Sequence, residues 1–177
     1  REMCNKFYFE KTRKRANDYL EKANDKDTET IINGMMVPAV HHMLDCIDKD
    51  WLCESTPSEF HGDFILDNII KTESGYCLID WRQDFAGNLN FGDIYYDLAK
   101  LNHNLILNHE NIKNNHFKIE NKENEISCDI LVNFSLMENR HMFREFLIEN
   151  DFDTKKVDVL TSLVWINMSP LHEYPLN

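Results

Sequence analysis

Several features that mark common classes of protein are missing from this sequence of 177 residues. Basic residues are in the minority, with 19 Lys and Arg against 31 Asp and Glu, and the formal net charge is -12. That charge disfavours a protein that follows nucleic-acid phosphates. No apolar run approaches the roughly 20 residues of a membrane-spanning helix, and no secretory signal is visible. We therefore expect neither a nucleic-acid partner nor a membrane span.

The cysteines lack the spacings that would give them a structural role. The five of them stand at positions 4, 46, 53, 77 and 128, and no two have the C-x-x-C spacing. An odd and scattered set disfavours both a disulfide framework and a zinc site. Reduced cysteines are typical of intracellular proteins, which predicts a cytoplasmic location. A Gly-rich phosphate loop of either common pattern is also missing.

What is present is the composition of a globular domain. Hydrophobic residues make up 42% of the chain, with 11 Phe, 6 Tyr and 3 Trp, enough for one sizeable core. The Asn33-Gly34 pair predicts a hairpin over residues 29–37, and a second hairpin is predicted from Ile69 to Ile79 after a short strand at 58–60. Apolar spacing predicts helices over residues 3–23, 38–47, 93–107, 129–149 and 154–168.

These elements predict a mainly α fold with a small antiparallel β insert, an α+β single domain over residues 1–177. The insert and the loop before it cover residues 58–81. No alternation of strands and helices indicates a parallel sheet. Residues 48–58 are expected to be loop. The polar segment 108–127 is expected to be a surface excursion around a weak hairpin at residues 117–126.

The stretch HGDFILDN, residues 61–68, carries the first indication of chemistry. A hairpin that starts after Asn68 and ends at Asp80 brings these two side chains together, beside Asp63. Amide and carboxylate oxygens are ligands that suit Mg²⁺, and the remaining carboxylate can take a proton from a hydroxyl group. These are the parts of a phosphoryl-transfer site. Loop capping and turn formation are the alternative explanation, which the joint spacing disfavours.

Taken with LIDW and GDIYYDLAKL further along the chain, HGDFILDN resembles the aminoglycoside phosphotransferase and choline kinase family. This family is the small-molecule branch of the protein-kinase-like fold. The resemblance is specific over roughly residues 55–105 and looser to the end of the chain. It implies that Asp63 is the catalytic base and that Asn68 and Asp80 bind Mg²⁺.

The same resemblance assigns two supporting residues. It implies that His61 belongs to the catalytic loop and holds it in shape. It also implies that Asp97 hydrogen-bonds the backbone of that loop, which is a structural role. ATP, or another nucleoside triphosphate, is the implied phosphoryl donor.

The resemblance covers only the C-terminal lobe of the two lobes that make up the family's fold. The smaller N-terminal lobe of the family supplies a β-sheet, a phosphate-covering loop and a lysine, whereas only a helix and a short hairpin precede His61. We therefore expect the chain to correspond to the C-terminal lobe, to need the missing N-terminal lobe or its parent chain as a partner, and to bind nucleotide poorly by itself.

Departures from the family pattern bear on the substrate. Gly62 stands where protein kinases have Arg, and no Ala-Pro-Glu segment is present, which disfavours a protein kinase. Arg82 stands where choline kinases usually have an acidic residue, and an arginine suits an anionic substrate. The basic run at residues 11–15 offers either a contact for a substrate phosphate or a solvated helix face, and the solvated face is favoured.

In the resembling kinases the C-terminal helices form a wall of the substrate pocket. Trp165, Asn167 and His172 are therefore candidate substrate contacts, together with Arg82. Packing is the favoured explanation for Trp165.

We therefore expect a small-molecule kinase that transfers the γ-phosphoryl group of ATP to a metabolite. Sugars, amino sugars and cell-surface polysaccharide precursors are the acceptors that the family suggests. Two alternatives stay open. One is a catalytically incomplete, kinase-like binding module. The other is an aminoglycoside-type antibiotic kinase, which the acidic net charge allows and Arg82 disfavours.

Overall fold

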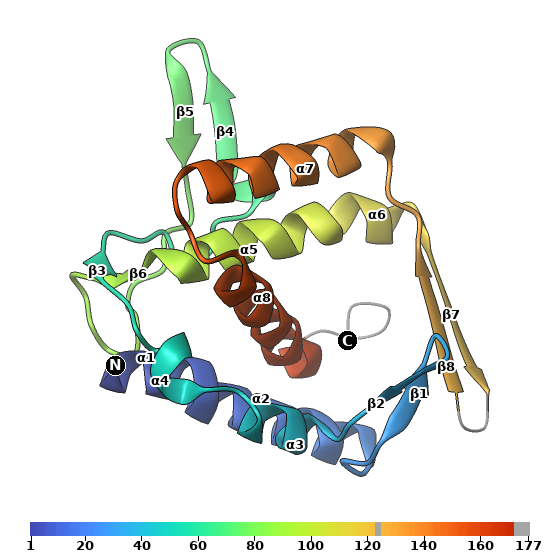
Figure 1. Ribbon diagram of the computed structural model, residues 1–177. Coiled ribbons are helices and arrows are strands. Elements are labelled where there is room, and N and C mark those ends of the chain that lie inside the picture. The colour runs from blue at the N-terminus through green and yellow to red at the C-terminus, as the bar shows by residue number, and fades with distance from the viewer. Residues whose placement is uncertain (123–124, 172–177) are drawn as a thin grey trace.

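The computed structural model describes residues 1–122 and 125–171 of the chain. It is a mixed α and β structure, about 51% helical and 19% strand, which is compatible with the predicted α+β class (Figure 1). The α-helices are α1 Glu2–Asn5, α2 Lys11–Ala23, α3 Val40–Asp45, α4 Lys49–Leu52, α5 Ile94–Ile106, α6 His109–Lys113, α7 Phe134–Glu149 and α8 Thr154–Met168. The strands are β1 Thr30–Ile32, β2 Met35–Val37, β3 Pro57–Ser58, β4 Ile69–Thr72, β5 Gly75–Leu78, β6 Gly92–Asp93, β7 Phe117–Lys122 and β8 Glu125–Ile130.

The predicted N-terminal helix is confirmed, with an irregularity that the apolar spacing did not show. A π-helical turn, Lys6–Glu10, joins α1 to α2. Its wider turn lets three consecutive aromatic residues, Phe7, Tyr8 and Phe9, all be buried. The helix ends at Asn24, whose left-handed backbone conformation is a common way to stop a helix.

The core is built around α5, which packs most closely on α8 (Figure 1). One group of buried side chains joins the N-terminal helix to these two helices, and a second joins them to α7. Tyr95, on α5, packs against both groups. Helices were predicted over residues 93–107 and 154–168. The structure confirms them as α5 and α8, to within one residue at each end.

The strands differ from the prediction in one important respect. The two predicted hairpins are present as β1–β2 and β4–β5, and β3 pairs with β6. The largest sheet, however, lies outside the predicted insert and has the order β2–β1–β8–β7, with β1 and β8 parallel. The predicted insert is antiparallel as expected, whereas the parallel β1–β8 pair was not predicted. The side chain of Asn33 fixes this junction, because it accepts a hydrogen bond from the Cys128 N–H and donates one to the Cys128 carbonyl.

Segments predicted to be irregular contain regular elements, each with a polar cap at its start. Residues 48–58 include α4, which Asp48 caps. The predicted excursion at 108–127 contains α6, and its hairpin extends to Ile130. As a result α7 begins at Phe134 instead of residue 129, with Asn133 as its cap.

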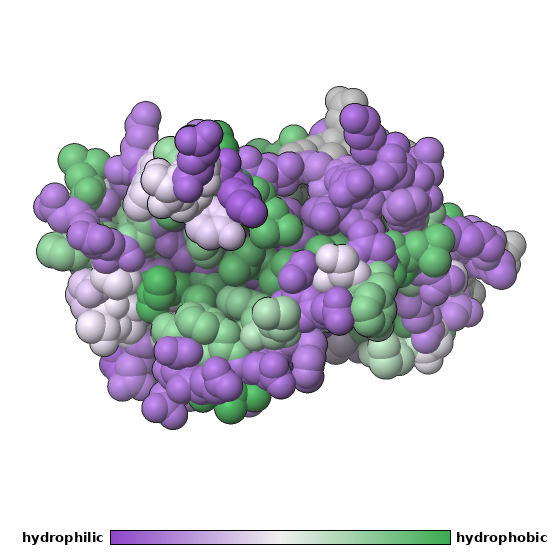
Figure 2. Space-filling view, turned by 90° about the horizontal axis from the view of Figure 1, so that it is seen from above, coloured by the Kyte–Doolittle hydropathy of each residue, from purple (hydrophilic) through white to green (hydrophobic). Residues whose placement is uncertain are grey.

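The upper side of the molecule in Figure 1 carries α7 and the β4–β5 hairpin. Figure 2 looks down on this side and shows hydrophobic surface between hydrophilic areas. Large hydrophobic side chains are exposed along α7, namely Phe134, Met137, Met142, Phe146 and Ile148. Within residues 1–122 and 125–171, none of the helices has the length and apolar character needed to cross a membrane.

Candidate functional site

The loop that carries the HGD residues is held by one carboxylate on α5. Asp97 accepts the backbone N–H of His61 on Oδ2, at 2.5 Å, and that of Gly62 on Oδ1, at 2.7 Å. Burial raises the pKa of Asp97, while the two N–H groups act in the opposite direction. Pairing of β3 with β6 brings the chain before the loop to the start of α5. The loop is therefore fixed to the core helix by the residue predicted for that role.

His61 uses both ring nitrogens within the protein. Nε2 donates to the carbonyl of Ile79, at 2.8 Å, and Nδ1 accepts the backbone N–H of Asp63, at 3.2 Å. The ring is buried and lies against Trp81, with a centroid distance of 4.8 Å. Because the Asp63 N–H donates to Nδ1, the hydrogen bond to Ile79 uses the proton on Nε2. His61 is thus arranged to position the loop and the β5 end, and it has no nitrogen free for a reacting group.

The structure brings Asp63, Asn68 and Asp80 to the same region, as the spacing predicts. The Asn68 side-chain amide donates to the Asp63 carbonyl, at 2.9 Å, and to Oδ2 of the Asp63 carboxylate, at 3.3 Å. The Asn68 carbonyl accepts the N–H of Ile79, at 3.0 Å, so the returning strand places Asp80 beside Asn68. Asp80 has a φ of +59°, a left-handed conformation that turns the chain as it leaves the hairpin.

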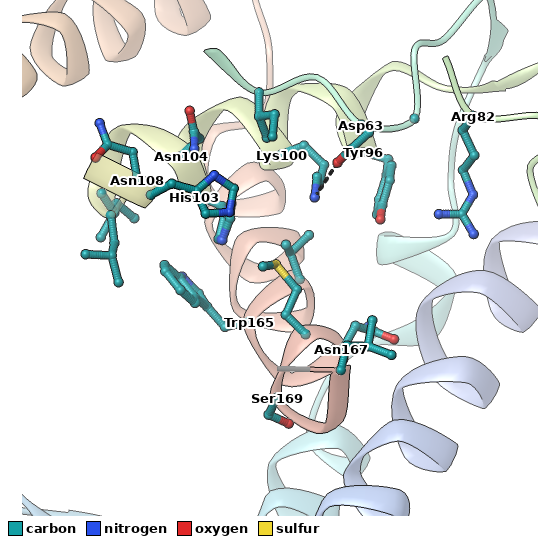
Figure 3. A pocket seen from close by; sticks show the side chains of 18 of the residues that line it. Asp63, Arg82, Tyr96, Lys100, His103, Asn104, Asn108, Trp165, Asn167 and Ser169 are labelled. Carbon is teal, nitrogen blue, oxygen red and sulfur yellow. Dashed lines mark ion pairs between the residues drawn. The ribbon is translucent and has the colours of Figure 1, made fainter. Parts of the chain in front are cut away.

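Asp63 and Asp80 both line a cavity of about 960 Å³. Its walls come from the HGD loop, the segment after β5, the face of α5 that ends in α6, and parts of α2, β8 and α8. Figure 3 shows Asp63, Tyr96 and Lys100 side by side along one wall, with Trp165 and Asn167 on α8 across the opening. The volume is in the range of sites for small organic ligands.

Lys100 is a site residue that the sequence analysis missed. Its Nζ lies 2.6 Å from Oδ1 of Asp63, and its side chain is only 11% exposed (Figure 3). Lys100 follows Asp97 by three residues, so both reach the HGD loop from the same side of α5. The helical spacing of DLAKL was the available signal, but only the packing of the loop on α5 shows which face it meets.

Basic side chains of α2 also reach the cavity. Lys11 and Arg15 are one helical turn apart, and both are half-buried and line the wall. Burial lowers the pKa of Lys11 to about 8, and the nearby charges of Arg82 and Arg15 act in the same direction. Lys14, in the same run, is exposed. The expected solvated face is therefore wrong for Lys11 and Arg15 and correct for Lys14.

The candidate substrate contacts on α8 are only partly free. Trp165 lines the cavity but packs on His103, with a centroid distance of 4.2 Å. Asn167 also lines it, and its amide donates to the Thr12 hydroxyl, at 2.6 Å, and to the Leu163 carbonyl. His172 lies outside the described residues. Arg82, the fourth predicted contact, lines the cavity at its exposed edge.

His103 is a second residue that the sequence analysis missed. It is buried on α5, lines the cavity, and has a pKa lowered to about 4, first by burial and then by the charge of Lys100. A neutral imidazole therefore forms part of the wall near Lys100.

Asn68 and Asp80 carry the kinds of oxygen atom that suit a magnesium ion, but Asn68 is buried and is not among the residues that line the cavity. The amide nitrogen of Asn68 points to Asp63, which leaves its amide oxygen for a cation, and Asp80 is an exposed carboxylate at the same end of the hairpin. In the described part of the chain, no group of three or more His, Cys, Asp and Glu side chains is placed to hold a metal ion. Two protein ligands are enough for Mg²⁺ where substrate phosphates and water complete its shell.

Comparison of the chain with family models, curated proteins and solved structures gives no significant match.

Proposed function

We propose that this chain is the acceptor-binding and base-carrying lobe of a small-molecule phosphotransferase with the protein-kinase-like arrangement. One observation carries the proposal. Asp97 fixes the backbone of His61 and Gly62, and the next residue, Asp63, then faces a cavity that Asp80 also lines. A carboxylate held rigidly at the edge of a ligand-sized cavity, with a second oxygen-donor pair beside it, is what in-line phosphoryl transfer needs from a protein.

In the proposed reaction, the oxygen of an acceptor hydroxyl forms a bond to the γ-phosphorus of ATP. The bond between that phosphorus and the β,γ-bridging oxygen breaks, and ADP leaves with the bonding electrons. Asp63 takes the hydroxyl proton, and it is the catalytic residue of the proposal. Lys100, at 2.6 Å from Asp63, is a positioning residue that restricts the carboxylate to one orientation.

Asn68 and Asp80 would hold the magnesium ion of the nucleotide. The ion supplies positive charge that neutralises the phosphate oxygens during transfer. The other groups act without it. Asn68 also orients Asp63 through its amide nitrogen, and His61 keeps the hairpin end and the loop in register through Ile79.

The test uses the full-length protein. Nucleotide turnover is measured with Mg²⁺ and a panel of hydroxyl acceptors, in the wild type and in Asp63→Asn. We expect acceptor-dependent ADP release that falls by about a hundredfold or more in Asp63→Asn, because general-base catalysis contributes at least that factor. The matched control is Asp67→Asn, in the same loop, since Asp67 is exposed, does not line the cavity, and has its ion pair with His109, at the cavity wall, and not with Asp63 or Lys100.

Two results would contradict the proposed reaction. A folded protein that binds no Mg²⁺-nucleotide, or one whose turnover is the same in Asp63→Asn and Asp67→Asn, would overturn the proposed reaction. Retention of small-molecule binding in that case would leave a kinase-like binding module.

A further inference from the structure

The cavity differs in charge from the rest of the protein. The chain has a formal net charge of -12, yet among the described residues four basic side chains and two carboxylates line the cavity. The basic residues are Lys11, Arg15, Arg82 and Lys100. The carboxylates are those of Asp63, which Lys100 neutralises, and Asp80, which the proposed function assigns to Mg²⁺. Three positive charges are left over.

None of these three side chains forms an ion pair in the described part of the chain, although the carboxylate of Asp84 is near enough to act on the charge of Lys11. The ion pairs found there include neither Lys11, nor Arg15, nor Arg82. Arg13, on the same helix, shows the contrast, because it pairs with Asp45 at 2.5 Å. Arg82 donates from Nε to the main-chain carbonyl of Asp84, which leaves the two terminal nitrogens of its guanidinium group for a ligand.

The three cations are also held in place by the fold. The Nζ of Lys11 lies 4.3 Å from the centre of the Phe7 ring, and the Cζ of Arg82 lies 5.0 Å from the same centre. Arg15 follows Lys11 by one turn on α2. In Figure 3, Arg82 lies beyond Tyr96 from the Asp63–Lys100 pair. The basic group is therefore next to the proposed reaction centre but separate from it.

We propose that the acceptor carries an anionic group of the phosphate class, which Lys11, Arg15 and Arg82 bind, while a hydroxyl of the same molecule reaches Asp63. The repulsion among three like charges that have no ion-pair partner is relieved when an anion binds between them. Two arginines and a lysine match phosphate oxygens through charge-assisted hydrogen bonds. A polycationic or quaternary-amine acceptor would be repelled by the same group.

The reaction part of this inference rests on the proposed function, but the anion site can be tested without turnover. Binding of inorganic phosphate to the full-length protein is measured by titration without Mg²⁺ or nucleotide. We expect binding that weakens about tenfold or more in Arg82→Gln and in Lys11→Gln, since each loses a charge-assisted hydrogen bond. Lys14→Gln, an exposed lysine of the same helix, is the control and should bind as the wild type does.

A turnover experiment then uses matched acceptors that differ by one phosphate, such as glucose and glucose 6-phosphate. The phosphorylated acceptor should have the higher kcat/KM, and Arg82→Gln should raise its KM by about tenfold or more, a larger factor than the change in the KM of the neutral acceptor. Loss of phosphate binding equally in Lys14→Gln, or preference for neutral or cationic acceptors, would overturn the inference.

The two proposals can fail separately. Phosphate binding that depends on Arg82 in a protein without nucleotide turnover would contradict the kinase reaction and retain the anion site. Turnover that depends on Asp63, with no contribution from Lys11 or Arg82, would retain the kinase reaction and contradict the anion site.

Discussion

The side chain of Arg82 occupies the space that a side chain at position 62 would need. A Cβ built on Gly62 would lie 2.4 Å from the Cβ of Arg82 and 2.9 Å from its Cδ. The backbone N–H of Arg82 also donates to the His61 carbonyl, at 2.8 Å. The glycine of the HGD loop and the arginine at the edge of the cavity are thus one packing unit. The arginine can lie across the loop only because residue 62 has no side chain.

Gly62→Ala should therefore cost more than backbone strain alone. Gly62 has a φ of +82°, and alanine in the left-handed region costs about 1–2 kcal/mol. The contact with Arg82 adds about 1–3 kcal/mol of overpacking. Gly87→Ala is the matched control, because Gly87 has a φ of +87° but no described atom lies within 4 Å of its built Cβ. Urea unfolding of both variants gives the difference, and equal losses would contradict the packing unit.

Tyr8→Phe should destabilise the junction between the N-terminal helix and α5. The Tyr8 hydroxyl donates to Oδ2 of Asp93, at 2.6 Å, and both residues are buried. Asp93 also caps α5 through the N–H of Tyr95. Removing the hydroxyl leaves a buried carboxylate short of a donor, at a cost of about 1–3 kcal/mol of unfolding free energy. Tyr76→Phe, on the exposed β5, should change stability by less than about 0.5 kcal/mol in the same denaturation experiment.

His103 should make the protein less stable in acid. Its pKa is lowered from 6.5 to about 4, so the folded state disfavours the protonated ring. This contribution to stability is complete above pH 6.5 and is lost as the pH falls through about 4, by up to about 3 kcal/mol. The unfolding free energy of the wild type should fall more steeply over this range than that of His103→Phe. Parallel curves for the two proteins would contradict this assignment.

Lys11 should make anion binding weaken in alkaline solution. Its pKa of about 8 means that the free site loses this charge as the pH rises from 7 to 9. Burial lowers this pKa most, the charges of Arg82, Arg15 and Lys100 lower it further, and that of Asp84 raises it. Sulfate is the suitable probe, since its own charge is constant over this range. We expect its affinity to fall by several-fold in the wild type.

Lys11→Arg is the control for this pH dependence, because an arginine stays charged throughout the range. Its sulfate affinity should be nearly constant from pH 7 to 9. A decline as steep as that of the wild type would contradict the assignment of the pH dependence to Lys11.

Local chemistry explains which elements could be predicted from the sequence. The Asn33-Gly34 turn and the spacing from Asp63 to Asn68 act over a few residues, and both appear in the structure as expected. Asp97 was found through the family resemblance, and its two hydrogen bonds to the HGD loop agree with that role. The start of α7 was misplaced because the end of β8 and the residues up to the Asn133 cap include the apolar run 130–132, which equally suits a helix.

The contacts that were missed all join distant parts of the chain. The Asn33 side chain meets the Cys128 backbone across 95 positions, and neither residue type suggests this pairing. Lys100 faces Asp63 only because α5 packs with that side toward the loop. Lys11 and Arg15 line the cavity and follow a π turn, and a regular helical period gives no sign of such a turn.

Because of the π turn, the N-terminal helix should be more sensitive to insertions and deletions than to substitutions. Each residue in an α-helix rotates the next by about 100° and advances it by about 1.5 Å. Deleting one residue from Lys6–Glu10 would restore an ordinary α-helix. The side chains before the deletion would then be rotated about the helix axis relative to those after it. Either the aromatic residues would leave the core or the basic residues would leave the cavity. Small insertions and deletions in this segment should therefore be tolerated far less than exchanges of single side chains.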